Sequence, residues 1–142
     1  MARRNDIIDT FKAHLETTLI NDVASVDKRY LYMDEINDFP AITFVARREA
    51  RQHRGDGRKL ATIRVDLRVY IYDRDINDLD LIVRKIEEQI LVFKDLAAAR
   101  ALGVEECQTV TVDGDEGLMR PYQVGDMQIL ITYDVDTQYE SP

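Results

Sequence analysis

Aspartates gather at one place in the sequence where they could bind a divalent metal, because hard cations prefer oxygen ligands. This first acidic group comprises Asp73, Asp75, Asp78 and Asp80. Oxygen-bearing side chains at 73, 75 and 77 resemble the start of a calcium-binding loop. However, Asp78 stands where such a loop needs glycine, and Arg84 stands where it needs glutamate. We therefore interpret these aspartates mainly as capping and solvated residues, with a metal site as the alternative.

A second acidic group, formed by Asp113, Asp115 and Glu116, raises the possibility of a nuclease. A metal-dependent nuclease needs acidic residues and a lysine that converge on Mg²⁺. Asp66 and Lys59 are conceivable further members of such a site. Nothing in the spacing of these residues brings them together, so the nuclease stays an alternative only.

A Cys-His catalytic pair would have to use Cys107, the single cysteine, with one of two histidines. No local pattern joins Cys107 to His14 or His53, and His14 is expected on the surface of a helix. The sequence contains no phosphate-binding loop, dinucleotide-binding fingerprint or nucleophile elbow. We therefore expect no enzyme, no cofactor and no metal.

The cysteine count and the ends of the chain also bear on the compartment. One cysteine excludes an internal disulfide, the N-terminus is too polar for a signal peptide, and no apolar run approaches the ~20 residues that span a bilayer. These features predict a reducing compartment such as a cytoplasm.

Basic residues concentrate in the segment from Arg47 to Lys59. The segment contains Arg47, Arg48, Arg51, Arg54, Arg58 and Lys59. Against Glu49 and Asp56 these six give a charge of +4 in a chain of net charge −8, so the remainder carries −12. The acidic total argues against general nucleic-acid binding, which needs a basic footprint. The split charge favours contact between copies or with an acidic partner, although a solvated hairpin tip would explain it too.

The stretch from 62 to 72 has the strict alternation of a β-strand. One face carries Ile63, Val65, Leu67, Val69 and Ile71. The other face is polar but includes two arginines and two tyrosines, so we expect it to be half exposed and available to a partner. The predicted partner interface therefore consists of Arg47, Arg48, Arg51, Arg54, Arg58, Lys59, Arg64, Arg68, Tyr70 and Tyr72.

Flanking elements follow from hydrophobic periodicity and turn residues. Helices are predicted over 5–20 and 79–93, with Asn5 and Asp78 as caps, and a short helix follows Asp95 and ends at Gly103. Further strands are predicted over 26–33, 41–48, 104–112 and 124–135, with a polar loop over 49–60. We predict a single α+β domain over 1–142 with a frayed tail at 136–142. Its mostly antiparallel sheet is packed by the N-terminal and central helices and bears a long basic hairpin loop.

Two stretches carry a likeness to a known family. In the first, IRVDLRVYIY at 63–72 leads through an acidic turn to a helix that begins LDLIVRKIE at 79. In the second, EGLMRPY at 116–122 is followed by MQILITYDV at 127–135. With these stretches, its size and its order of elements, the whole chain resembles the tail terminator (tail completion) proteins of long-tailed bacteriophages.

The resemblance implies a structural virion protein: an α+β subunit that closes into a homohexameric ring, caps the tail tube, stops its polymerisation and joins tail to head. The implied partners are further copies of the chain, the tail tube protein and a head-completion or neck protein. DNA would pass through the ring without specific binding, and no membrane is involved. The implied location is the head-proximal end of the tail, and the host cytoplasm during assembly. A neck or head-completion connector and a small metal-dependent phage nuclease remain the alternatives.

Overall fold

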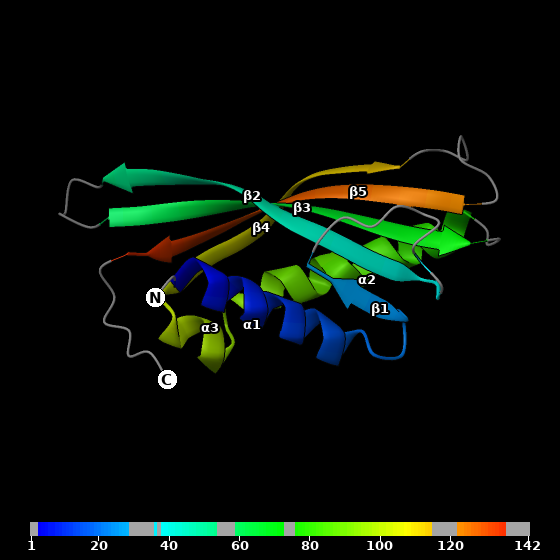
Figure 1. The fold of residues 1–142 in the computed structure, drawn as a ribbon, viewed down its shortest axis with the longest axis horizontal. Coiled ribbons are helices and arrows are strands. Elements are labelled where there is room, and N and C mark those ends of the chain that lie inside the picture. The colour runs from blue at the N-terminus through cyan, green and yellow to red at the C-terminus, as the bar shows by residue number, and fades with distance from the viewer. Residues whose placement is uncertain are drawn as a thin grey trace.

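The computed structural model describes residues 3–28, 36, 38–53, 59–72, 76–114 and 122–135. Its helices are α1 (Arg3–Thr18), α2 (Ile76–Phe93) and α3 (Ala97–Ala101). Its strands are β1 (Ser25–Asp27), β2 (Ala41–His53), β3 (Lys59–Tyr72), β4 (Val104–Gly114) and β5 (Tyr122–Asp134). The strands form one sheet in the order β1-β2-β3-β5-β4, and the helices lie together on one side of it (Figure 1).

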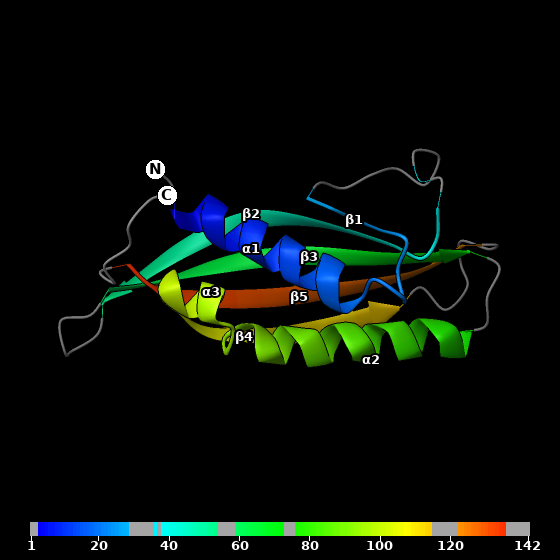
Figure 2. The ribbon, with the colours of Figure 1, turned by 90° about the horizontal axis from the view of Figure 1, so that it is seen from below.

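The pairing makes this an α+β fold with a mostly antiparallel sheet, as predicted. β3 is the central strand and pairs antiparallel with β2 on one side and with β5 on the other. β5 in turn pairs antiparallel with β4, whereas β1 runs parallel to the first residues of β2. In Figure 2, α1 crosses the β2–β3 side of the sheet and α2 lies along the β4 side.

The apolar face of β3 is covered by the helices, as its alternation predicts. Leu67 and Val69 are fully buried, which confirms that this strand is central to the core. The ring of Phe11 on α1 meets Phe44 of β2 and Phe93 of α2 edge to face, with centroids 5.6 and 5.2 Å apart. Edge-to-face pairs add about 0.5–1.5 kcal/mol beyond burial, so this ring fastens α1 to both the sheet and α2.

Both long helices begin before their predicted caps. Asn5 lies inside α1, which starts at Arg3, and Asp78 lies in the first turn of α2, which starts at Ile76. The prediction of these residues as caps is therefore wrong. In the first turn, Asp78 still lies near the positive end of the helix dipole.

The short helix α3 also departs from its predicted cap. Leu96 occupies the N-cap position without a side-chain hydrogen bond, and Asp95 instead forms an ion pair with Arg100 at 3.5 Å. α3 ends at Ala101 with Leu102 as its C-cap, two residues before the predicted end at Gly103. Gly103 follows the cap, and its φ of 86° lies in the left-handed region that favours glycine.

His14 is buried instead of lying on the surface as expected. Only 8% of it is exposed, and its Nε2 donates a hydrogen bond to the carbonyl oxygen of Gln89, 2.9 Å away. The helical periodicity placed His14 at the edge of the apolar stripe of α1. The packing of α2 against that edge covers it.

The predicted loop at 49–60 is mostly strand. β2 continues to His53 and β3 begins at Lys59, with these two residues paired across the hairpin. Antiparallel pairing satisfies the backbone hydrogen bonds of the charged segment, so its polarity does not prevent strand formation. Arg47, Arg48 and Arg51 are therefore strand residues, whereas Arg54 and Arg58 lie outside the described residues.

Strand lengths differ from the prediction elsewhere too. β4 continues to Gly114 and β5 begins at Tyr122, each two residues beyond its predicted limit. β1 covers only the start of the predicted strand at 26–33, and residues 29–35 lie outside the described part of the chain. The predicted tail at 136–142 lies outside it as well.

Candidate interface on the open face of the sheet

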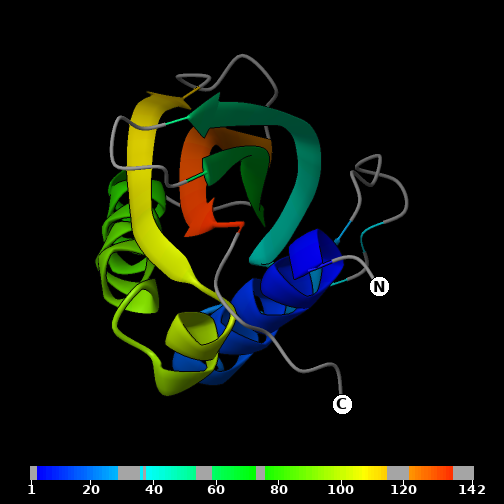
Figure 3. The ribbon, with the colours of Figure 1, turned by 90° about the vertical axis from the view of Figure 1, so that its left-hand side faces the viewer.

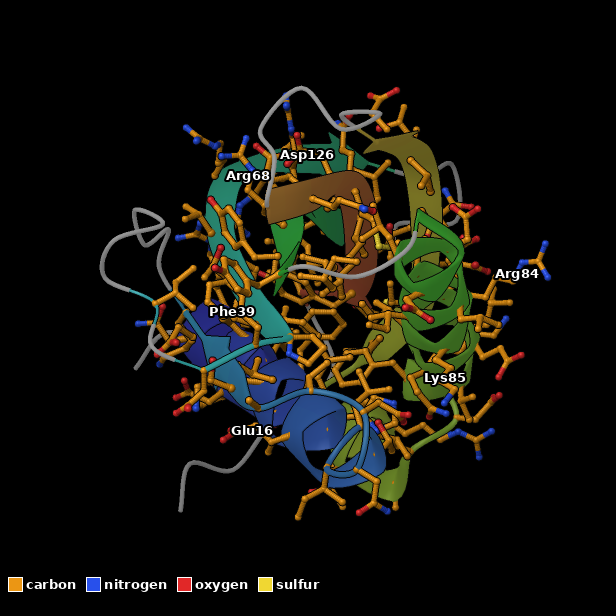
Figure 4. All side chains as sticks on the ribbon, turned by 90° about the vertical axis from the view of Figure 1, so that its right-hand side faces the viewer. Glu16, Phe39, Arg68, Arg84, Lys85 and Asp126 are labelled. Atoms are coloured by element: carbon orange, nitrogen blue, oxygen red, sulfur yellow. The ribbon has the colours of Figure 1, made fainter. Side chains whose placement is uncertain are left out.

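The side of the sheet opposite the helices, called the open face below, carries charged side chains in rows across the strands. In one row, Arg68 of β3 stands opposite Asp126 of β5, which stands opposite Asp113 of β4. Figure 4 shows Arg68 and Asp126 together, on the far side of the sheet from α1 and α2. A shallow groove of about 630 Å³ runs over this area, lined by Arg47, Arg64, Asp66, Leu67, Arg68, Thr111, Asp113, Asp126, Met127 and Gln128.

Asp66 lies between two arginines near the middle of the open face. Its Oδ2 is 2.8 Å from Nε of Arg47 and its Oδ1 is 3.1 Å from Nε of Arg64. The side chain of Asp66 is 17% exposed, whereas those of Arg47 and Arg64 are 52% and 45% exposed. Exposed ion pairs contribute about 0–1 kcal/mol each, so this cluster does little for the stability of the subunit. Each guanidinium carries five N–H donors, which makes the pair suited to carboxylates of another molecule.

Arg68 forms a further ion pair of this face. Its Nε and Nη2 donate to the carboxylate of Asp126 at 2.6 and 3.4 Å, and its Nη1 lies 3.4 Å from the hydroxyl of Tyr70. The hydrogen bond to Asp126 raises the pKa of Arg68 further above its usual range, although burial opposes this change. Arg68 therefore holds its charge and offsets the repulsion between the cross-strand neighbours Asp126 and Asp113.

The two tyrosines of the predicted interface differ in exposure. Tyr70 is only 3% exposed and packs with Ile36, Ala41 and Val124 in a small apolar cluster separate from the main core. Tyr72 is 47% exposed. The expected half exposure therefore holds for Tyr72, whereas Tyr70 is already covered by its own subunit.

The basic residues of β2 divide between the two faces of the sheet. Arg47 lies at an irregularity of the β2–β3 register, and Arg48 stands opposite Arg64, so its position belongs to the open face. Arg51 stands opposite the buried Ala61, so it belongs to the side of the helices. Cross-strand partners share a face because the pleat alternates in both strands together.

The structure thus brings Arg47, Arg64 and Arg68 together and separates Arg51 from them. It adds Asp66, Asp113 and Asp126, which were not among the predicted interface residues. The alternation of β5 could have placed Asp126 on the open face, since it is in phase with Gln128 and Leu130. Its pairing with Arg68, 58 residues away, is not visible in the sequence.

Those of the residues considered for catalysis or metal binding that the structure describes are not gathered into a site. Cys107 is buried, and this burial raises the pKa of its thiol to about 12, so it remains a neutral thiol and a poor nucleophile at neutral pH. Among the described residues, no three histidine, cysteine or acidic side chains are placed to hold a metal. Asp73, Asp75, Asp115 and Glu116 lie outside those residues. No helix in the described ranges is long and apolar enough to cross a membrane.

Comparisons with known proteins give the chain a family. A family model described as "Bacteriophage Tail Tube Terminator Protein" matches residues 1–140, and no curated protein matches the sequence. One similar solved structure is the sheath/tube terminator of an extracellular contractile injection system, PVC, in the extended state, determined by cryo-EM. It is 12% identical with a TM-score of 0.42, and the match covers 96% of this chain but 60% of that one. Because the family model covers nearly its whole length, the chain belongs to the bacteriophage tail tube terminator proteins, structural components of the phage tail.

Proposed function

We propose that this protein closes into a ring of six identical subunits at the head-proximal end of the tail. The family gives the chain a structural role in capping the tail tube. The ring would seat on the last tube layer, stop polymerisation and then bind a head-completion protein. Assembly would take place in the host cytoplasm, and the finished ring would remain in the virion.

The observation that carries the ring is a change of charge sign across the sheet. Strand β2 holds three arginines against one glutamate, for a net charge of +2. Strand β4 holds Glu105, Glu106 and Asp113 without a basic residue, for a net charge of −3. A ring needs two different, complementary patches on every subunit, because each copy meets its neighbour head to tail. The basic and acidic sides of this sheet are such a pair.

The residues assigned to partner contacts are the basic hairpin and the exposed part of the open face. Arg47, Arg64 and Tyr72 are about half exposed in the single subunit. Arg48, Arg51, Arg54, Arg58, Lys59 and Arg68 complete the set. Arginine binds carboxylates through two parallel N–H donors, which gives direction as well as attraction. The carboxylates would come from the next copy or from the tube.

The proposed role is structural throughout. Binding by charge and shape is enough to stop growth of the tail tube. A ring whose outer surface does not resemble the end of the tube offers no place for the next layer of tube subunits to bind. We therefore propose no hydrolytic activity on DNA, peptides or phosphoesters, with or without a divalent metal.

The oligomeric state of the purified protein tests the ring. Sedimentation equilibrium should give one mass, a fixed multiple of the subunit mass, and negative-stain microscopy should show closed particles with a central hole. The measurement is made on the protein alone and with assembled tail tubes present. A monomer under both conditions would contradict the ring and leave only the family's capping role.

A further inference from the structure

We propose that neighbouring subunits join edge to edge, with β4 of one copy added to the outer edge of β2 in the next copy. The sheet would then continue from subunit to subunit around the ring. This inference rests on the proposed ring and names the surfaces through which it closes. The partner is a second copy of this chain.

Both strands present a long edge in the described part of the chain. β4 has 11 residues and pairs there with β5 alone. Near the opposite edge of the sheet, β1 pairs with Ala41–Thr43 of β2. Beyond these residues, β2 pairs with β3 alone among the described strands. Figure 3 shows β4 and β2 at the two opposite sides of the twisted sheet. A strand edge exposes a row of backbone N–H and C=O groups that can pair with another strand.

Each edge has bulges and charged side chains but keeps a regularly paired stretch within the described residues. Monomers shorten, bulge, charge or cover their edge strands. Here Nη2 of Arg4 covers the carbonyl of Ala46 at 3.0 Å. Strand β4 has register irregularities between Val104 and Glu106 and between Thr109 and Thr111, and it pairs regularly from Glu106 to Thr109. It also exposes 50% of Val110 and 44% of Val112, which are apolar side chains that a partner strand would cover.

Strand directions make the proposed joint antiparallel. β2, β3, β5 and β4 alternate in direction across the sheet, because each neighbouring pair is antiparallel. β4 therefore runs opposite to β2. Copies related by rotation about a ring axis keep their strand directions along that axis, so β4 meets β2 of the next copy antiparallel. Antiparallel pairs have the better-aligned hydrogen bonds.

Charge decides which edges meet. Pairing of β2 with β4 sets a strand of +2 against a strand of −3. Two β2 edges would place arginines opposite arginines, and two β4 edges would place carboxylates opposite carboxylates. Opposite charges across strands stabilise a pair and like charges destabilise it. The charges therefore favour the head-to-tail joint that a ring requires and disfavour the symmetric dimers.

Disulfide trapping tests this joint in the full chain. In a Cys107→Ala background, Ala50→Cys on β2 is combined with Glu106→Cys or with Gln108→Cys on β4. All three positions belong to the open face, since they stand opposite Thr62, Thr132 and Leu130. Directly opposed residues of antiparallel strands lie within disulfide distance, about 4.4–6.8 Å between Cα atoms. After oxidation, we expect one combination to give a ladder of disulfide-linked subunits on a denaturing gel. The largest band of the ladder should contain as many subunits as the ring.

A matched control uses Ala50→Cys with Val112→Cys. Val112 stands opposite the buried Met127, so its side chain belongs to the other face of the sheet and cannot reach Ala50→Cys across a paired strand. It should give no ladder, and neither should single-cysteine variants. A ring by sedimentation without a ladder from either open-face combination would show that subunits meet elsewhere, and would leave the proposed ring intact. A monomer by sedimentation, both alone and with assembled tail tubes, would overturn the joint and the ring together.

Discussion

The two faces of β3 have different relations to water, although they belong to the same residues of one strand. On the helix side, Ile63, Val65 and Leu67 are 0% exposed. On the open face, the side chains of Arg64 and Arg68 are 45% and 37% exposed and are held in ion pairs. Burial of an aliphatic side chain contributes about 1.5–3 kcal/mol, whereas an exposed ion pair contributes about 0–1 kcal/mol. The helix side therefore determines the fold, and the open face is available for recognition at little cost in stability.

The largest expected effect comes from the covered face. Leu67→Ala should lower the free energy of unfolding by about 2–5 kcal/mol, because it removes buried methyl groups and leaves a cavity in the core. Denaturant unfolding measures the loss. Arg64→Ala on the same strand is the control and should change stability by less than about 1 kcal/mol. Equal losses in the two variants would break the contrast between the faces.

Substitutions in the basic segment from Arg47 to Lys59 should weaken assembly without affecting folding. Arg51→Glu with Arg54→Glu should leave the thermal unfolding midpoint nearly unchanged but weaken ring formation or tail joining. Loss of one partner of a buried charge pair weakens the free energy of association by about 2–5 kcal/mol. Loss of one partner at the rim of the interface weakens it less, and that effect depends on salt. Sedimentation at low and high salt, together with a complementation assay for tail assembly, measures the change.

The control for this double variant carries the same change of charge on the helix layer. Arg84→Glu with Arg100→Glu alters exposed arginines of α2 and α3 (Figure 4 shows Arg84 pointing away from the core). It should assemble like the wild type. If both double variants assemble normally, the hairpin is a solvated tip and its proposed role is wrong.

Cys107, which is buried, should make the stability of the protein depend on pH. Burial raises its pKa to about 12 in the folded chain, against about 8.5 in an unfolded one. Above pH 9 the unfolded thiol ionises while the folded thiol stays neutral, so stability falls as pH rises towards 12. The slope is about 1.4 kcal/mol per pH unit for this one group. Unfolding at pH 8, 9 and 10 should show a steeper decline for the wild type than for Cys107→Ala. Parallel declines would mean that the thiol is accessible in the folded protein.

The smallest effect is expected at the centre of the open face. Asp66→Asn removes the carboxylate between Arg47 and Arg64, two pairs in which both arginines are about half exposed. The free energy of unfolding should change by no more than about 1 kcal/mol. The difference from the wild type should shrink in high salt, because salt screens exposed ion pairs. A loss of several kcal/mol, independent of salt, would assign this cluster to the fold instead of to recognition.

Several features follow from the amino-acid sequence alone because they depend on local periodicity. The alternation of β3 identifies its buried face, since successive side chains of a strand point in opposite directions whatever lies beside it. The apolar stripe of α2 and the glycine end of α3 are local in the same sense. The α+β class and the family likeness rest on these patterns, and both are confirmed.

Tertiary structure alone decided the features that depend on distant segments. Asp126 meets Arg68 because β5 adds to β3 in one register, and a shift of one residue would turn Asp126 to the other face. His14 is buried because α2 packs over the edge of its helix, and Tyr70 because Ile36, Ala41 and Val124 gather around it. Strand order likewise sets basic β2 and acidic β4 at opposite sides of the sheet. Each of these contacts joins segments whose meeting is set by packing and register, which no local pattern contains.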